Sequence, residues 1–203
     1  MDALRNQLKT LNQQFAFYTK QKTASKNNLI ALLDMTFPGV NTLFDSPARD
    51  DGSQKWVDFA ESFWHVDCIR SIGITAFTER YRKWCKRHGY NFQPSKVKEI
   101  YDNSKNLIAV FPKDALTKTL IKQSVTQLNA VSATVEHIRS EMNRIASKLP
   151  EYPVVMSMYG VGASLGPQLM AETGDISRFH RRENLTAFAG VDPGASLDRK
   201  SVV

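Results

Sequence analysis

Two long stretches of the chain repeat hydrophobic residues at alternating steps of three and four. The first stripe holds Leu4, Leu8, Leu11, Phe15, Tyr18, Leu29 and Leu32, with polar Lys22 and Ser25 in the same frame. The second holds Ile121, Leu128, Val131, Val135, Ile138, Met142, Ile145 and Leu149. This spacing is typical of a coiled coil and predicts long helices over about 3–36 and 113–149. The sequence "FPG" at 37–39 ends the first helix.

Stripes of this kind need a partner surface, and the sequence leaves its identity open. The economical arrangement packs the two helices antiparallel, as a coiled-coil arm with residues 37–112 as a helical cap at its far end. Pairing with a second copy of the chain fits equally well and predicts a homo-oligomer. An ordinary helical bundle core would give the same pattern.

The stretch between the two stripes is rich in aromatic residues. Residues 46–53, "SPARDDGS", read as a turn, and a short helix follows with Trp56, Phe59, Phe63 and Trp64. Another helix, "TAFTERYRKWCKRHG", carries Phe77, Tyr81, Trp84 and His88 on one face and ends at Gly89. These rings predict a small core. Residues 106–112, "NLIAVFP", permit one short strand, and the fold class is mainly α.

Composition favours an intracellular protein with a polyanionic partner. Lysine and arginine outnumber aspartate and glutamate 27 to 20, giving a net charge of +7. Cys68 and Cys85 are too few for a disulfide framework and are not spaced as metal ligands, which suits free thiols in a cytoplasm. We find no apolar signal core and no run of about 18 apolar residues, so we expect no membrane segment.

Residues 80–98 contain basic side chains and no acid. We expect Arg80, Lys83, Lys86 and Arg87 to contact nucleic-acid phosphates. The interleaved aromatic residues lie at helical spacing, which favours a place in the core over base stacking.

A glycine turn between two apolar helices marks a second candidate interface, in "PVVMSMYGVGASLGPQLMAETG". This is the pattern of a helix-hairpin-helix, in which Gly160 and Gly162 would let the backbone approach a phosphate at the start of the second helix. Arg178, Arg181 and Arg182 follow closely and would add positive charge. The alternatives without a binding role are an ordinary turn and a cluster of solvent-exposed arginines.

Candidate catalytic residues are scarce. The four histidines His65, His88, His137 and His180 lie far apart, which argues against a metal cluster. We assign no catalytic residue, no metal ligand and no cofactor to this chain.

A family resemblance comes with the C-terminal third of the chain. The glycine hairpin, "GDISRF" and "FAGVDP" occur in the order and spacing of the C-terminal transposase domain of the insertion-sequence one-ten family, also called the one-sixteen and nine-oh-two group. Residues 1–149 resemble the helical region that precedes that domain, and residues 150–197 resemble the domain itself. The chain is thus similar to a DNA transposase of this family, as a fragment.

The resemblance implies properties of a larger protein. Such transposases recombine DNA with an N-terminal RuvC-like domain, whose acidic ligands imply Mg²⁺, and with a serine nucleophile in the C-terminal domain. They form oligomers and use a structured guide RNA. We expect the RuvC-like domain to precede residue 1, so none of its ligands transfers to a position here. The serine would fall near Asp198, where neither Ser196 nor Ser201 is followed by the glycine that the family pattern has.

The last residues suggest a foreign origin. Back-translation of "DRKSVV" can give GAT CGG AAG AGC GTC GTG, which matches a common sequencing adapter, so we expect 198–203 to be adapter read-through. The interpretation is a transposase fragment that binds DNA and does no chemistry alone. The alternatives are a non-catalytic DNA- or RNA-binding scaffold and an RNA-binding accessory protein.

Overall fold

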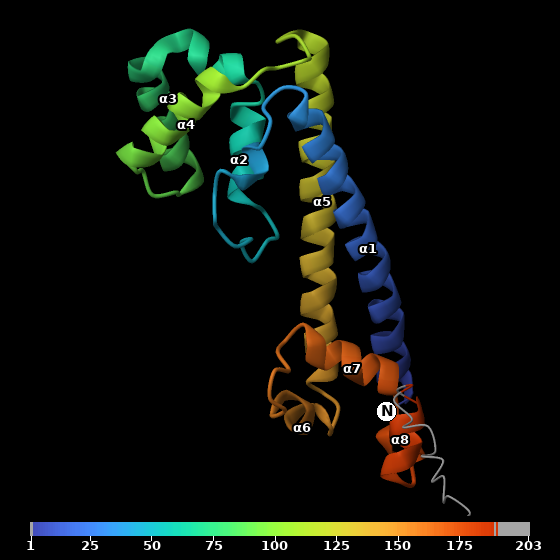
Figure 1. Ribbon diagram of the computed structural model, residues 1–203. Helices are drawn as coiled ribbons and strands as arrows, with labels where there is room; N and C mark the ends of the chain where they lie inside the picture. Colours follow the sequence, from blue (N-terminus) through green and yellow to red (C-terminus); the bar gives the residue numbers. More distant parts are fainter. Residues whose placement is uncertain (1, 189, 191–203) are drawn as a thin grey trace, which may run out of the picture. The chain divides into compact units, whose positions relative to one another are not determined.

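The computed structural model describes residues 2–188 and 190, apart from the side chain of Arg182, and every regular element in that part of the chain is a helix (Figure 1). The α-helices are α1 (Asp2–Asp34), α2 (Lys55–Ser62), α3 (Gly73–His88), α4 (Pro94–Asn106), α5 (Ala115–Ala146), α6 (Tyr152–Met156), α7 (Leu165–Thr173) and α8 (Arg182–Phe188). Short 3-10 turns lie at Val40–Thr42, Val66–Cys68, Arg70–Ile72 and Ile176–Arg178. The predicted mainly α class is confirmed.

The chain divides into two compact units. The larger unit comprises residues 11–144, and the smaller unit combines residues 1–10 with residues from 145 onward. Each unit is described separately below.

In the larger unit, α1 and α5 run antiparallel and side by side (Figure 1). The Asn28 side-chain amide donates to Ser124 Oγ at 2.9 Å. Further along the pair, Lys22 Nζ lies 3.7 Å from Glu136 Oε1. Residue numbers therefore fall on one helix as they rise on the other, which is the arrangement predicted for a pairing within the chain. Assembly with a second copy stays a prediction.

The two hydrophobic stripes differ in how deeply they are buried. Within the larger unit, every predicted apolar position on α5 is buried: Ile121, Leu128, Val131, Val135, Ile138 and Met142. On α1 only Leu29 of the predicted stripe is buried there, together with Leu33, whereas Leu11, Phe15 and Tyr18 are half-buried. The polar positions Lys22 and Ser25 interrupt the α1 stripe, so α5 is the better-covered partner.

The predicted aromatic core is confirmed and centres on Phe59, which is fully buried. Its ring contacts those of Phe37, Phe44, Phe63, Tyr81 and Trp84, at centroid distances from 4.8 to 6.2 Å. Beside this cluster, the buried Asp58 accepts a hydrogen bond from the Tyr90 hydroxyl at 2.6 Å. Burial and this hydrogen bond raise the pKa of Tyr90, so the hydroxyl stays protonated as the donor. Edge-to-face and offset ring contacts add stability beyond the buried area.

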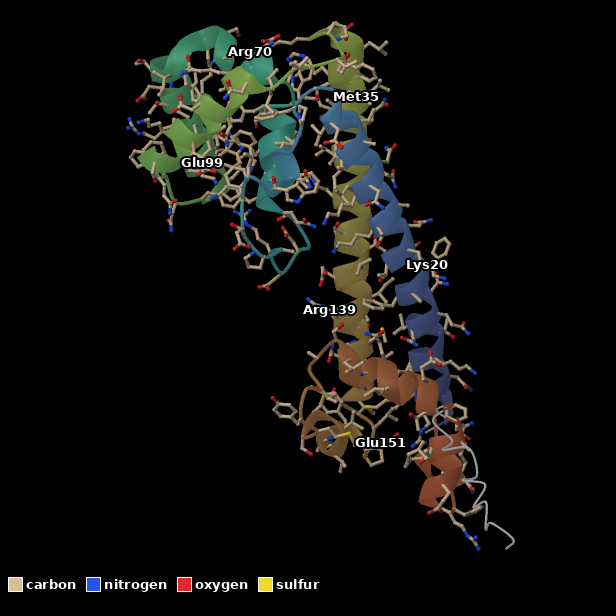
Figure 2. The ribbon with its side chains drawn as sticks, viewed as in Figure 1. Lys20, Met35, Arg70, Glu99, Arg139 and Glu151 are labelled. Carbon is tan, nitrogen blue, oxygen red and sulfur yellow. The ribbon has the colours of Figure 1, made fainter. Side chains whose placement is uncertain are left out.

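The segment after α4 is not a strand, which corrects one expectation. The backbone N–H groups of Val110 and Phe111 both donate to the Met35 carbonyl, at 2.8 and 2.9 Å. The Phe111 carbonyl in turn lies 3.0 Å from His65 Nε2. These backbone groups form hydrogen bonds with the end of α1 (Met35 is labelled in Figure 2) and with the His65 side chain, and not with a neighbouring strand.

In the smaller unit, a few apolar residues make a compact core: Leu8, Ile145, Ala146, Leu149, Met170 and Ala171 are all buried. The Arg5 guanidinium donates to Glu151 Oε1 at 3.0 Å, with both side chains mostly covered (Glu151 is labelled in Figure 2). A Cβ at Gly166 would lie 2.5 Å from Met156 Sδ, so glycine is what lets α7 pack closely on α6.

Candidate nucleic-acid interfaces

The first candidate interface lies in the larger unit, on the basic face of α3. Buried Phe77, Tyr81 and Trp84 fix one face of this helix against the core. Arg80, Lys83 and Arg87 are exposed at steps of three and four, so they share another face. Gly89 caps the helix at φ 68, and its N–H bonds the Cys85 and Lys86 carbonyls, as expected from the sequence.

This face forms one wall of a groove of about 760 Å³. Its basic lining residues are Arg80, Lys83, Arg87 and His88 on α3, and Lys113, Lys118 and Lys122 before and on α5. The remaining lining residues are Glu61, Ser62, Phe63, Trp64, Cys68 and Trp84. Lys86, which the sequence grouped with its neighbours, does not line the groove. The term basic groove refers below to this site.

The basic groove concentrates positive charge far more than the chain as a whole. Six lysines and arginines line it with a single carboxylate, that of Glu61, whereas the whole chain has 27 basic and 20 acidic residues. Among the described residues, no carboxylate lies within ion-pair distance of Arg80, Lys83, Arg87, Lys118 or Lys122. Lys113 donates instead to the Asp67 carbonyl at 3.1 Å. Such a hollow attracts anions.

The aromatic rings behind the groove are not available for base stacking. Phe63, Trp64 and Trp84 are 5%, 6% and 4% exposed, so other side chains cover their faces. Their role is to support the wall, and the expectation that the α3 aromatics belong to the core is confirmed. What the groove offers a nucleic acid is charge directed at phosphates.

The sequence alone did not single out Lys113, Lys118 and Lys122. A signal existed for two of them, because Lys118 and Lys122 are four apart on a predicted helix and so share a face. Their proximity to α3, however, depends on the tertiary fold.

The second candidate interface is the glycine turn of the smaller unit, residues 157–164. Gly160 has φ +79, the left-handed region that favours glycine. The N–H of Val161 donates to the Met158 carbonyl at 3.1 Å, and the N–H of Gly166 donates to the Gly162 carbonyl at 2.9 Å. Ser164 precedes α7, and its side chain makes no capping hydrogen bond. Because the Gly166 N–H is bonded and Pro167 has none, the helix dipole and the N–H of Leu165 are what favour an anion there.

Among the described glycines, Gly162 is the one with neither a positive φ nor a close neighbour at the Cβ position. Its φ is not positive, and a Cβ built on it would meet no described atom within 4 Å. By contrast, the positive φ of Gly160 favours glycine, and a Cβ at Gly166 would displace the Met156 side chain. A side chain at 162 would therefore only fill open space beside the turn.

The predicted arginines follow the glycine turn in sequence. Arg178 is exposed, with its guanidinium carbon 4.6 Å from the ring centroids of both Phe179 and Phe188. Arg181 is exposed as well. Arg182 begins α8, and its side chain lies outside the described part of the structure. Asp175 accepts hydrogen bonds from Ser177, which lower the pKa of its carboxyl group.

Neither interface contains a metal site. Across residues 2–188 and 190, no three histidine, cysteine or acidic residues group closely enough to hold an ion. The Mg²⁺ that the family resemblance implies for a RuvC-like domain stays a prediction. Cys68 and Cys85 are free thiols, and burial raises the pKa of Cys68 although nearby Lys113 opposes the rise. None of the described helices is long and apolar enough to cross a membrane.

Two expectations fall outside the described residues. They are the position of the family's serine, near Asp198, and the interpretation of 198–203 as adapter read-through.

Comparison with known proteins finds two similarities. Residues 152–196 match the model described as "Transposase IS116/IS110/IS902 family". A Streptomyces coelicolor protein named "Insertion element IS110 uncharacterized 43.6 kDa protein" is 22% identical over 182 residues, covering 90% of this chain and 43% of that relative. The chain thus spans less than half the length of the relative. A search of solved structures found no match. The resemblance seen in the sequence is confirmed, since residues 152–196 match the IS116/IS110/IS902 transposase family and most of the chain aligns with an IS110 element protein.

Proposed function

We propose that this chain acts in DNA transposition and binds DNA through the glycine turn of residues 157–164, assisted by Arg178 and Arg181. The observation that carries the proposal is the family match over residues 152–196, which contain this turn. Recombination by the whole protein is part of the proposal. No described residue is assigned a catalytic step.

The local geometry supports a backbone contact to phosphate. A phosphate at the start of α7 would meet the N–H of Leu165, since the Gly166 N–H is bonded to the Gly162 carbonyl and Pro167 has none. Open space at Gly162 would let the DNA backbone come close to the protein backbone. Contacts of this kind position a duplex without reading its sequence.

The test is Gly162→Ala in the full chain, measured by fluorescence anisotropy on two duplexes of unrelated sequence. The added methyl group occupies the space that the phosphate would need, and hydrogen bonds to a charged group are worth about 1.5–3 kcal/mol. Affinity should therefore fall about tenfold or more, equally for both duplexes. Folding should not suffer, since replacing an unstrained glycine restricts the unfolded chain.

The matched control is Gly174→Ala, the same substitution at the other end of α7. A Cβ there also meets open space, and the positive φ of 67 predicts some loss of stability with DNA affinity retained. Equal affinity of Gly162→Ala and the wild type, with unchanged thermal unfolding, would overturn the proposed contact.

Two finer features come from the family resemblance, namely a structured guide RNA and a homo-oligomer. Electrophoretic mobility shifts with structured RNA test the first. Analytical ultracentrifugation of the full chain tests the second, with a purely monomeric protein at micromolar concentration as the contrary result.

A further inference from the structure

We propose that the basic groove is a second nucleic-acid site, which binds the sugar-phosphate backbone without regard to base sequence. Its residues belong to the larger unit and lie outside the segment matched by the transposase family. The site therefore goes beyond the DNA contact proposed for the glycine turn.

The first argument is that unpaired basic residues gather in the groove, although among the described residues Lys86 and Lys98 outside it have no ion pair either. On α3 and α4, several basic side chains that do not line it pair with an acid three residues away: Arg82 with Glu79, Lys96 with Glu99 and Lys105 with Asp102. Within the described residues, Arg80, Lys83 and Arg87 lack such a partner, and so do Lys118 and Lys122. Like charges gathered around one hollow repel one another, and an anionic ligand relieves that repulsion.

The second argument is the layout of the charges. From Arg80 to Arg87 the α3 row spans about 10 Å at 1.5 Å per residue. This length corresponds to about three nucleotides along one strand at 3.4 Å each. Lys118 and Lys122 add a second row on α5, about 6 Å long by the same rise. Two rows facing one hollow suit a backbone that runs between them.

The third argument concerns the class of ligand. Pockets for small molecules are mostly apolar with few polar groups, whereas half of this lining consists of basic side chains. The covered rings of Phe63, Trp64 and Trp84 leave nothing for a base to stack on. The features that remain select a polyanion by charge, so we assign the phosphodiester backbone as the ligand.

The test compares two double variants of the full chain with the same loss of charge. Lys118→Gln with Lys122→Gln removes the α5 row of the groove. Lys86→Gln with Lys98→Gln removes two exposed lysines that do not line it. Binding to a duplex DNA of about 20 base pairs, in two unrelated sequences, and to a structured RNA is measured between about 50 and 200 mM salt.

The groove variant should show a shallower salt dependence. Each phosphate contact contributes about 0.9 to the slope of log affinity against log salt, so two lost contacts reduce its magnitude by about 1.8 on duplex DNA. The loss of affinity between the two salt concentrations then becomes about tenfold smaller. The reduction should be the same for both DNA sequences and larger than in the control variant.

The outcomes separate the two nucleic acids. A change on duplex DNA, on RNA or on both supports the groove and identifies the source of the backbone. Equal behaviour of groove and control variants on every probe would overturn it, as would a strong dependence on DNA sequence. Adding Gly162→Ala distinguishes the two sites, because a failed glycine-turn contact leaves the groove effect unchanged. A second groove variant, Arg80→Gln with Lys83→Gln, checks the opposite wall.

Discussion

Gly52 provides a sharp test of how the turn-rich loop at 46–53 packs on α5. It has φ +82, and a Cβ built on it would lie 2.9 Å from the Ser132 carbonyl oxygen and 3.0 Å from the Ser132 carbonyl carbon. Both atoms belong to the backbone of a long helix, which cannot shift at low cost. We therefore predict that Gly52→Ala destabilises the larger unit by more than its backbone strain alone.

The magnitude has two parts. A left-handed conformation costs a non-glycine residue about 1–2 kcal/mol, partly offset by about 0.4–1 kcal/mol from the less flexible unfolded chain. Forcing an extra carbon into a packed contact costs about 1–3 kcal/mol. The free energy of unfolding should fall by about 2–4 kcal/mol in total.

Comparison with Gly89→Ala isolates the packing cost. Gly89 also has positive φ, 68, but a Cβ there meets nothing within 4 Å, so this variant should lose only about 1 kcal/mol. Urea unfolding followed by tryptophan fluorescence is the suitable assay, because all three tryptophans of the chain lie in the larger unit. Equal destabilisation by the two variants would refute the packing of Gly52 against Ser132.

Three further predictions concern stability. Phe59→Ala should cost about 3–5 kcal/mol in urea unfolding because the ring is fully buried, whereas Phe17→Ala, at a side chain 51% exposed, should cost far less. Asp114 accepts the Thr117 N–H at the start of α5, which lowers the pKa of its carboxyl group below 3.8. The ionised carboxylate therefore stabilises the fold above pH 3.8, and this stabilisation is lost as the pH falls through the lowered pKa of the folded state. Acidification should destabilise Asp114→Asn less than the wild type. A double-mutant cycle on Lys22 and Glu136 should give a coupling below about 1 kcal/mol in urea unfolding, because the charged atoms lie 3.7 Å apart and Glu136 also pairs with Arg139; a larger coupling would contradict this.

Hydrophobic periodicity predicted the long helices well because the spacing of buried positions depends on the geometry of a single helix. The α5 stripe from Ile121 to Met142 is buried as predicted. The α1 stripe follows the same spacing, yet most of its positions are only half-buried, since the polar residues Lys22 and Ser25 interrupt that face. Periodicity identifies a face and says less about how completely it is covered.

Properties that depend on tertiary contacts were harder to predict. The segment 106–112 resembles a strand by composition, but its donors bond the end of α1. The start of α4 had a local signal in Pro94, which suits the first helical position. Each wall of the basic groove had a local signal as well, but the meeting of residues 80–87 with 113–122 had none, because it depends on the tertiary fold. Likewise, the special character of Gly162 is visible only once the space around it is known.

The hydrogen bonds from Val110 and Phe111 to the Met35 carbonyl have a topological consequence. They join the segment that follows α1 to the segment that precedes α5, so the residues between them form a closed loop inserted in the α1–α5 hairpin. The entropy of closing such a loop changes slowly with its length, by about 0.6 kcal/mol for each doubling. Residues 36–109 therefore form one closed insertion in the hairpin, and a modest change in the length of its exposed loops should alter the entropy of closure only slightly.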